Sequence, residues 1–259
     1  MKIGMCTIAF REVDILEVIK IAGDTGFSGI ELWGREGHSG VAGRRIPSIK
    51  KACEKRGLEI NSFGSYLNLS SKNFHAEMEE TLDICRLLNP GILRVWAGDK
   101  SSKDTSEEEY AGILANGKIL AECLKETGII AAPEFHSGTF CDNSAGILRL
   151  AGDISRENFR AYWQPLWQDN FNQSLEDVLP ILVNIHAQNF KVDVETKKRS
   201  AASLEKGDVD YRLVVEKLKA GGYTGYIEIE FIGGTGVREK TSLLKKDFDF
   251  LKQVLSGCL

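Results

Sequence analysis

Long apolar runs, an amino-terminal apolar leader and clustered basic residues are all missing from this sequence. Its longest stretch without a charged side chain, 178–190, has 13 residues, whereas a membrane-spanning helix needs about 20 apolar ones. Charged residues appear at positions 11, 12 and 14, which is too early for a secretion signal. We therefore expect a protein without a membrane segment that is located in the cytoplasm.

Paired cysteines are missing as well. The six cysteines are scattered, and no Cys-x-x-Cys pair occurs, so reduced thiols are favoured over a disulfide framework or a thiolate zinc site. The chain has 33 Lys and Arg against 37 Asp and Glu, a net charge of −4, and its longest basic run is 197–199. Because phosphate contacts need clustered positive charge, we expect no nucleic-acid partner.

The sequence does contain a regular alternation of short apolar runs and amphipathic stretches. Asp14 with Glu17 and Ser106 with Glu109 are typical of helix starts. A Gly-x-Gly-x-x-Gly motif, the mark of a dinucleotide-binding open sheet, does not follow the first run. Eight near-regular units predict a (β/α)8 TIM barrel, one domain over 1–259. The expected strands are 3–10, 29–33, 58–67, 92–97, 129–135, 159–164, 181–190 and 226–232.

Polar residues at the carboxyl ends of barrel strands are the candidates for chemistry. Glu134, Gln164, His186 and Glu230 stand at four consecutive strand ends. Two carboxylates, one imidazole and one amide oxygen suit a divalent cation, with Mn²⁺ as first choice and Mg²⁺, Co²⁺ or Zn²⁺ as alternatives. Each residue could equally be a solitary polar group at the barrel mouth, and the spacing alone leaves both interpretations open.

The last expected strand carries two glutamates, Glu228 and Glu230. We expect Glu230 to face the barrel and Glu228 to face the helices. The expected alternation of side chains along a strand likewise turns His136 away from Glu134. If the strand has already ended at this point, His136 contacts substrate instead. Aromatic side chains near the mouth, among them Trp33, Tyr66 and Trp96, are candidates for packing against a carbohydrate ring, with core packing as the alternative.

Several motifs are more specific. Pro133-Glu134-Phe135-His136 precedes Ser137-Gly138-Thr139, Ile185-His186 lies in the seventh expected strand, and Gly221-Gly222-Tyr223 leads into Glu228-Ile229-Glu230. Together with Gly29-Ile30-Glu31-Leu32-Trp33, these segments resemble the sugar phosphate isomerase/epimerase family of xylose-isomerase-like TIM barrels. The resemblance covers essentially the whole chain and is most specific in its second half.

The resemblance implies one divalent metal held by Glu, Asp, His and Glu from strands five to eight. Carried onto this sequence, the ligands are Glu134, His186 and Glu230, and Gln164 replaces the aspartate. An amide oxygen can still bind a cation, but the ligand charge falls from −3 to −2, which implies weaker binding of a stronger Lewis acid. Asp169 is an alternative fourth ligand.

The resemblance also implies a mechanism. Glu134 and Glu230 act as the acid/base pair of an isomerase or epimerase that converts a keto-sugar or related polyol ketone through an enediolate. Arg199 corresponds to an arginine near the substrate oxygens, or else belongs to a solvated loop. A homodimer is a habit of the family. The alternatives are a dehydratase of a cyclic keto-polyol and a non-catalytic sugar-binding barrel.

Overall fold

The computed structural model describes residues 1–40, 43–167, 170–196 and 198–257. The first seven strands along the chain belong to the barrel, and a two-stranded hairpin follows them. The last strand returns to the barrel and pairs with the first. The barrel strands are β1 (Lys2–Cys6), β2 (Gly29–Trp33), β3 (Glu59–Asn68), β4 (Ile92–Trp96), β5 (Ile130–Pro133), β6 (Ala161–Trp163), β7 (Leu182–Ala187) and β10 (Tyr226–Ile229).

All neighbouring barrel strands are parallel, in the order β5-β4-β3-β2-β1-β10-β7-β6. Two isolated parallel bridges, Ala131 to Phe159 and Glu134 to Tyr162, connect β5 to β6. The amide of Phe135 also donates to the carbonyl of Tyr162 at 2.9 Å. The sheet is therefore a nearly closed barrel, and the predicted TIM fold is confirmed.

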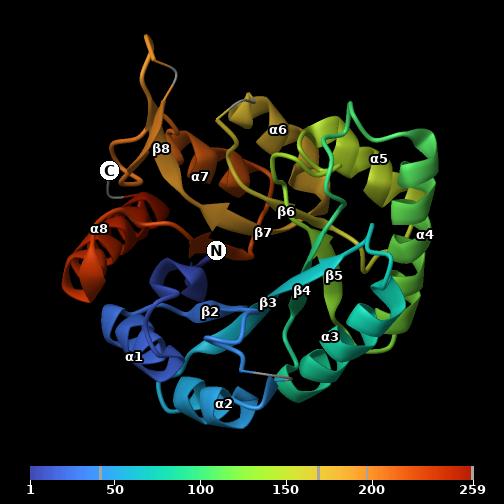
Figure 1. Ribbon diagram of the computed structural model, residues 1–259. Helices are drawn as coiled ribbons and strands as arrows, with labels where there is room; N and C mark the ends of the chain where they lie inside the picture. The colour runs from blue at the N-terminus through green and yellow to red at the C-terminus, as the bar shows by residue number, and fades with distance from the viewer. Residues whose placement is uncertain (41–42, 168–169, 197, 258–259) are drawn as a thin grey trace.

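Helices form an outer ring around these strands (Figure 1). They are α1 (Ile15–Thr25), α2 (Ile46–Glu54), α3 (Phe74–Leu88), α4 (Glu107–Leu124), α5 (Ser144–Ile154), α6 (Phe171–Val178), α7 (Tyr211–Ala220) and α8 (Gly236–Ser256), with short 3-10 turns at Thr7–Phe10 and Leu179–Ile181. The Asp14 side chain caps α1, and Ser106 with Glu109 forms a capping box on α4. Both predicted helix starts are therefore confirmed.

The main apolar core lies between the strands and the helices, where residues such as Ile30, Leu93 and Ile227 are fully buried. The barrel interior is different: among the described residues its apolar cluster consists of Ile92, Ala132 and Tyr162, with the partly buried Val183 packed against them. Barrel interiors of this fold are usually filled by bulky branched side chains. Here polar side chains occupy much of the interior, and they form the floor of the site described below.

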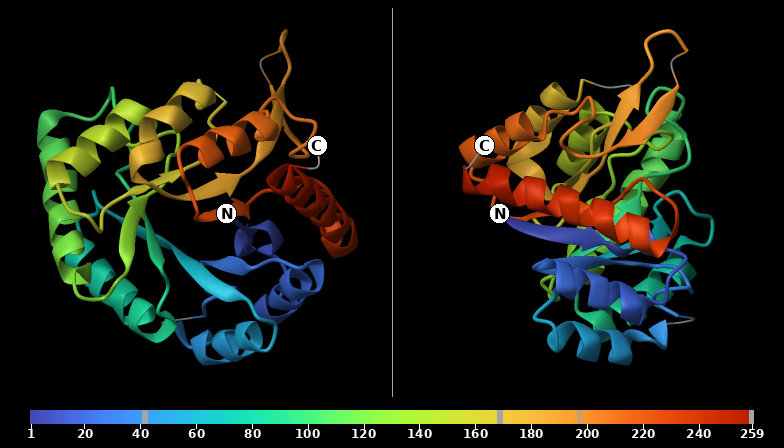
Figure 2. Two further views of the ribbon diagram at one scale, coloured as in Figure 1. Left: turned by 180° about the vertical axis from the view of Figure 1, so that it is seen from behind. Right: turned by 90° about the vertical axis from the view of Figure 1, so that its left-hand side faces the viewer.

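Six of the eight expected strands end one to four residues earlier than the sequence suggested, the first and the seventh with a change of structure. The first stops at Cys6 and continues as a 3-10 turn, and the seventh divides into β7 and a separate strand β8 (Asn189–Val192). Strand β8 pairs antiparallel with β9 (Arg199–Ala202), and this hairpin stands out from the barrel (Figure 2). Arg199 therefore lies on a strand of the hairpin and not in an irregular loop.

Two further observations bear on the expectations from sequence. No helix in the described part of the chain is long and apolar enough to cross a membrane. The five described cysteines are free thiols. Cys258 and the alternative ligand Asp169 lie outside the described residues.

Candidate active site

Four side chains from the second half of the barrel converge at the carboxyl ends of their strands. Glu134 follows β5, Gln164 follows β6, His186 lies in β7 and Glu230 follows β10. Each is at most 4% exposed. Because the carboxyl ends of all eight strands share one end of the barrel, residues far apart in sequence converge there. The structure therefore brings together the four residues predicted as metal ligands.

The imidazole of His186 lies at the centre of this group. Its Nδ1 is 3.1 Å from Glu134 Oε1 and 3.4 Å from Glu230 Oε1. One ligand atom from each of these three residues lies within 4.8 Å of the other two. Glu230 Oε2 is buried without a hydrogen-bond partner among the described residues. Two carboxylates, an imidazole nitrogen and an unsatisfied buried acceptor are a donor set that fits a divalent cation.

Gln164 takes part with its amide nitrogen. Its Nε2 donates to Glu134 Oε1 at 3.1 Å, while its Oε1 accepts from Gln188 Nε2 at 2.5 Å. The oxygen that the resemblance assigns to a cation therefore faces Gln188. Turning the amide by half a rotation would exchange the two atoms and bring the oxygen toward Glu134.

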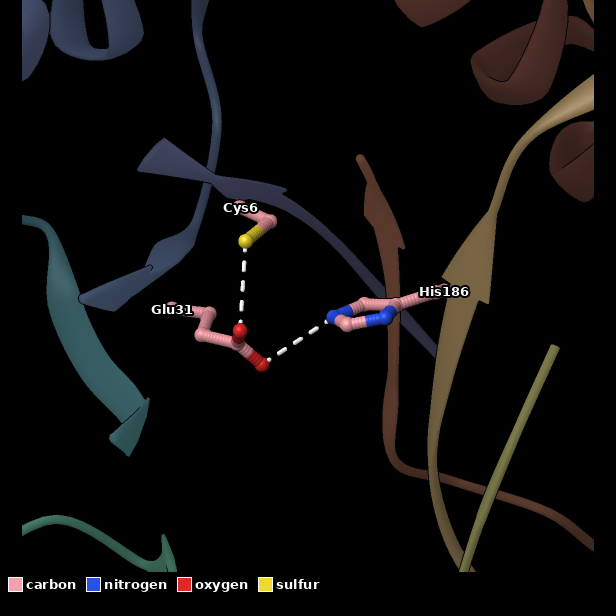
Figure 3. A group of neighbouring side chains, drawn as sticks. All are labelled: Cys6, Glu31 and His186. Atoms are coloured by element: carbon pink, nitrogen blue, oxygen red, sulfur yellow. Dashed lines mark hydrogen bonds and ion pairs between the residues drawn. The ribbon is translucent and has the colours of Figure 1, made fainter. Parts of the chain in front are cut away.

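A layer of charged and polar side chains lies beneath this group, supplied mainly by the first half of the barrel. Arg94 on β4 contacts two carboxylates: its Nε and Nη2 each lie 3.1 Å from Glu31 Oε1, and its Nη1 pairs with Glu134 Oε2. The other oxygen of Glu31, Oε2, lies 3.1 Å from the Nε2 of His186, and the thiol of Cys6 lies 3.1 Å from Oε1 (Figure 3). Cys6, Glu31 and His186 form a second group of converging ligand atoms.

The expectation that Glu228 faces the helices is wrong. Glu228 is fully buried inside the barrel, where its carboxyl group accepts from the side-chain amides of Asn61 and Asn184 and contacts the hydroxyl oxygen of Tyr162. The physical reason is simple: residues two apart in a strand point to the same face, so Glu228 and Glu230 both point inward at different depths. For His136 the other expected case holds: β5 has already ended at Pro133, and His136 lines the cavity next to Glu134.

The two carboxylates beside His186 differ in their electrostatic surroundings. Burial alone would raise the pKa of Glu134, but the Arg94 guanidinium holds that pKa below its usual range. Burial, the largest cause, together with the nearby Glu134 charge raises the pKa of Glu230 to about 7, against the opposing effect of His186. Burial would lower the pKa of His186, but Glu230 and Glu31 hold it well above its usual value. Glu134 is therefore ionised at neutral pH, while Glu230 and His186 hold protons readily.

A cavity of about 340 Å³ opens above these residues. Four of the predicted substrate-binding residues line it: Tyr66, Trp96, His136 and Arg199. The fifth, Trp33, lies behind Tyr66, whose hydroxyl accepts from its Nε1 at 2.9 Å. The remaining wall is lined by Ile8, Arg94, Glu134, Ser137, Gln164, Leu166, Trp167, Gln188, Glu230 and Phe231.

His136 faces this cavity with a defined orientation. Its Nδ1 lies 2.7 Å from the carbonyl oxygen of Ser137, which can only accept, so Nδ1 carries a hydrogen. The ring packs edge-on against Trp96, with centroids 4.8 Å apart. In the neutral ring Nε2 therefore keeps its lone pair. Trp163, in contrast, is fully buried and donates to Ser174 Oγ, as core packing requires.

Sequence reasoning missed the supporting residues Glu31, Arg94, Tyr162 and Glu228. Their signal was present: charged side chains in the middle of otherwise apolar strands have to be paired inside a barrel. Glu31 and Arg94 both lie within runs of apolar residues, Gly29–Trp33 and Ile92–Trp96. A search for opposite charges in buried strands would have found them.

Comparison with known proteins agrees with this architecture. The family model described as "Xylose isomerase-like TIM barrel" matches residues 19–254. A 3-dehydroshikimate dehydratase from Bacillus anthracis is 24% identical over 208 residues, which is 73% of this chain and 72% of that protein. A putative hydroxypyruvate isomerase from Drosophila melanogaster is 24% identical over 242 residues, 85% of this chain and 87% of that one.

A crystal structure of the probable 3-DHS dehydratase AsbF from Bacillus anthracis superposes with a TM-score of 0.82. It covers 97% of this chain and 99% of its own, at 21% sequence identity. At this sequence identity, the structural likeness shows the fold alone. The family model shows the family, because it matches nearly the whole chain. The chain belongs to the family of xylose isomerase-like TIM barrels, whose members compared here are enzymes named as a dehydratase and an isomerase.

Proposed function

We propose that this chain is a divalent-metal-dependent enzyme that removes a proton beside the carbonyl group of a small polyhydroxylated ketone. One observation carries the proposal: Glu134 and Glu230 converge on Nδ1 of His186 beneath a cavity of about 340 Å³. Two carboxylates whose pKa values are pushed apart are the arrangement expected of an acid/base pair.

Glu134, His186 and Glu230 would hold the cation, with the amide oxygen of Gln164 as a fourth ligand once the amide has turned. When bound, a divalent cation supplies a Lewis acid for the substrate carbonyl. The charges inside the barrel favour such a ligand. Four buried carboxyl groups, those of Glu31, Glu134, Glu228 and Glu230, surround the guanidinium of Arg94 and the imidazole of His186, so a cation that displaces the protons of Glu230 and His186 would be paired with buried carboxylates.

The residues divide the proton transfers between them. Glu134, kept ionised by Arg94, removes the proton from the carbon next to the carbonyl and leaves an enediolate. Glu230, on the same side of the His186 ring as Glu134, would return a proton to the opposite face or to the neighbouring carbon. Return to the opposite face gives an epimer. Return to the former carbonyl carbon, with the proton of the neighbouring hydroxyl passing to the former carbonyl oxygen, gives an isomer. Mn²⁺ is our first choice of cation, and Mg²⁺, Co²⁺ and Zn²⁺ are the alternatives.

Dehydration is the second candidate, and His136 is the observation that favours it. Elimination begins with the same proton removal by Glu134, but the bond to the hydroxyl on the next carbon then breaks and a carbon–carbon double bond forms. The departing hydroxyl needs a proton to leave as water. A protonated His136, which lines the cavity with Nδ1 already bonded to a carbonyl, can provide it from Nε2. The match to a 3-dehydroshikimate dehydratase points the same way.

The first experiment is calorimetric titration of Mn²⁺ into chelator-treated protein. We expect one ion per chain, with binding lost in Glu134→Gln and Glu230→Gln, while Lys245→Met, a change in an exposed ion pair, binds as the wild type does. All variants are checked by thermal unfolding. Absence of Mn²⁺ binding by the wild type at millimolar concentration would contradict the proposal.

The loaded enzyme is then incubated in D₂O with hydroxypyruvate, with ketohexoses and with 3-dehydroshikimate. Deuterium beside the carbonyl, without loss of water, indicates isomerisation or epimerisation. Loss of water from 3-dehydroshikimate, abolished in His136→Gln, indicates a dehydratase. If one of these compounds binds but shows neither deuterium exchange nor loss of water, the chain is a sugar-binding barrel without catalytic activity.

A further inference from the structure

The imidazole of His186 lies between two sets of carboxylates. On one side, Nδ1 faces Glu134 and Glu230 at 3.1 and 3.4 Å; on the other, Nε2 lies 3.1 Å from Glu31 Oε2. A neutral imidazole has one N–H and one lone pair, and only the nitrogen with the lone pair can bind a cation. Whichever nitrogen carries the hydrogen therefore decides which side of the ring can serve as a ligand.

Glu31 is held so that it can only accept. The Nε of Arg94 donates to its Oε1, and Nη2 forms an ion pair with the same oxygen at 3.1 Å. Ser62 Oγ donates to its Oε2 at 3.2 Å, and the hydroxyl of Tyr162 donates to that oxygen as well. The side chain is fully buried. A carboxylate that accepts several hydrogen bonds and is paired with a guanidinium stays ionised and has little freedom to rotate.

We propose that Glu31 is a positioning residue that fixes the hydrogen of His186 on Nε2 and so directs the lone pair of Nδ1 toward Glu134 and Glu230. The inference rests on the proposed function, because it assumes a cation on the Nδ1 side. Carboxylates that accept the second N–H of a metal-binding histidine orient the ring and raise its basicity. Figure 3 shows the carboxylate of Glu31 directed at the ring edge of His186.

The same group could be considered a separate cation site, because Cys6, Glu31 and His186 also offer converging ligand atoms. Arg94 argues against this. Its guanidinium occupies Glu31 Oε1, the oxygen that also faces the thiol of Cys6, and a second cation there would meet that buried positive charge at close range. The cluster is therefore better explained as a hydrogen-bonded support for His186.

The direct test uses the unaltered protein, loaded with diamagnetic Mg²⁺ and labelled with ¹⁵N in its histidines. Long-range ¹H–¹⁵N spectra distinguish a ring nitrogen that carries hydrogen from one that does not, and His186→Asn identifies the signals by their loss. We expect hydrogen on Nε2 and none on Nδ1. The reverse pattern, with hydrogen on Nδ1, would overturn the proposal whatever the variants do.

The variant Glu31→Gln preserves shape and removes the charge. We expect Mn²⁺ binding to weaken by about 10- to 100-fold, the range found when such supporting partners are removed. Asp247→Asn is the matched control, because Asp247 is also a buried carboxylate, but its partner is the backbone amide of Leu204 and it belongs to neither group around His186. Its dissociation constant should stay close to the wild-type value.

Two results would refute the role of Glu31: unchanged binding in Glu31→Gln, or equal weakening in both variants. Thermal unfolding of each variant accompanies the titrations, and if Glu31→Gln does not fold, the ¹⁵N spectra of the unaltered protein decide. Failure of the proposed function looks different, since wild-type protein would then bind no Mn²⁺ at all.

Discussion

The two halves of the barrel contribute different parts of the site. Strands β5 to β10 provide Glu134, His186 and Glu230, whose polar atoms converge on one another below the cavity. Strands β1 to β4 provide Glu31 and Arg94, which contact those residues from the barrel interior. One half offers the atoms that could bind a ligand, and the other holds them in place and sets their charge.

This difference explains why the barrel interior contains so much buried charge. Arg94 is 3% exposed and pairs with one carboxylate from each half, Glu31 and Glu134. Burying charge without a partner is costly, whereas a paired and hydrogen-bonded network can be tolerated. The support in the first half is therefore a condition for ionised carboxylates in the second.

The largest expected effect concerns this support. Arg94→Met leaves Glu31 and Glu134 buried without their cationic partner, and breaking a buried pair in this way costs about 3–5 kcal/mol of unfolding free energy. Urea denaturation measures the loss. The matched control is Lys245→Met, which breaks the exposed pair with Asp249 and should cost about 0–1 kcal/mol. If both variants lose the same unfolding free energy, Arg94 does not stabilise the buried carboxylates.

How much of the site could be predicted from the sequence differs between the two halves of the barrel. Glu134, Gln164, His186 and Glu230 were predictable because strand ends converge in a barrel, whatever the details of packing. Glu31 and Arg94 were not assigned because their importance comes from pairing across the interior, between residues 63 positions apart. The inward direction of Glu228 follows from strand periodicity and should have been predicted correctly. The β8–β9 hairpin carries Arg199 in a run of polar residues that lacks a clear strand pattern.

The pH dependence of cation binding tests the role of Glu230 and His186, which belong to the second half of the barrel. Burial raises the pKa of Glu230 to about 7, and the pKa of His186 lies well above its usual value. Both groups hold protons that a cation must displace, so affinity should rise as the pH rises. For each proton displaced we expect the Mn²⁺ affinity to increase about tenfold per pH unit.

Calorimetry at about pH 6, 7 and 8 would measure this trend, within the range where histidine and raised carboxyl groups titrate. Glu31→Gln should shift the profile, because it removes one of the charges that keep the pKa of His186 high. His75→Gln, a change at a histidine outside this group, should leave it in place. An affinity independent of pH would mean that neither Glu230 nor His186 is a ligand.

The smallest expected effect comes from Gln164→Asp. A carboxylate at this position adds one negative charge beside Glu134, His186 and Glu230, so Mn²⁺ should bind about tenfold more tightly, or ~1.4 kcal/mol. The added charge also lowers the Lewis acidity of the cation, so turnover should not rise in proportion to occupancy. Calorimetry with the stripped proteins measures the first effect, and the rate of deuterium exchange at saturating Mn²⁺ measures the second.

Gln164→Leu separates ligation from charge. If the Gln164 oxygen binds the cation after the amide has turned away from Gln188, loss of the oxygen weakens binding, and the three side chains rank Asp, Gln and Leu in order of falling affinity. If Gln164 only donates to Glu134, as its Nε2 does at 3.1 Å, removing that donor leaves Glu134 more available to the cation. Leucine would then bind Mn²⁺ at least as tightly as glutamine, and the fourth ligand would have to come from the substrate or from water.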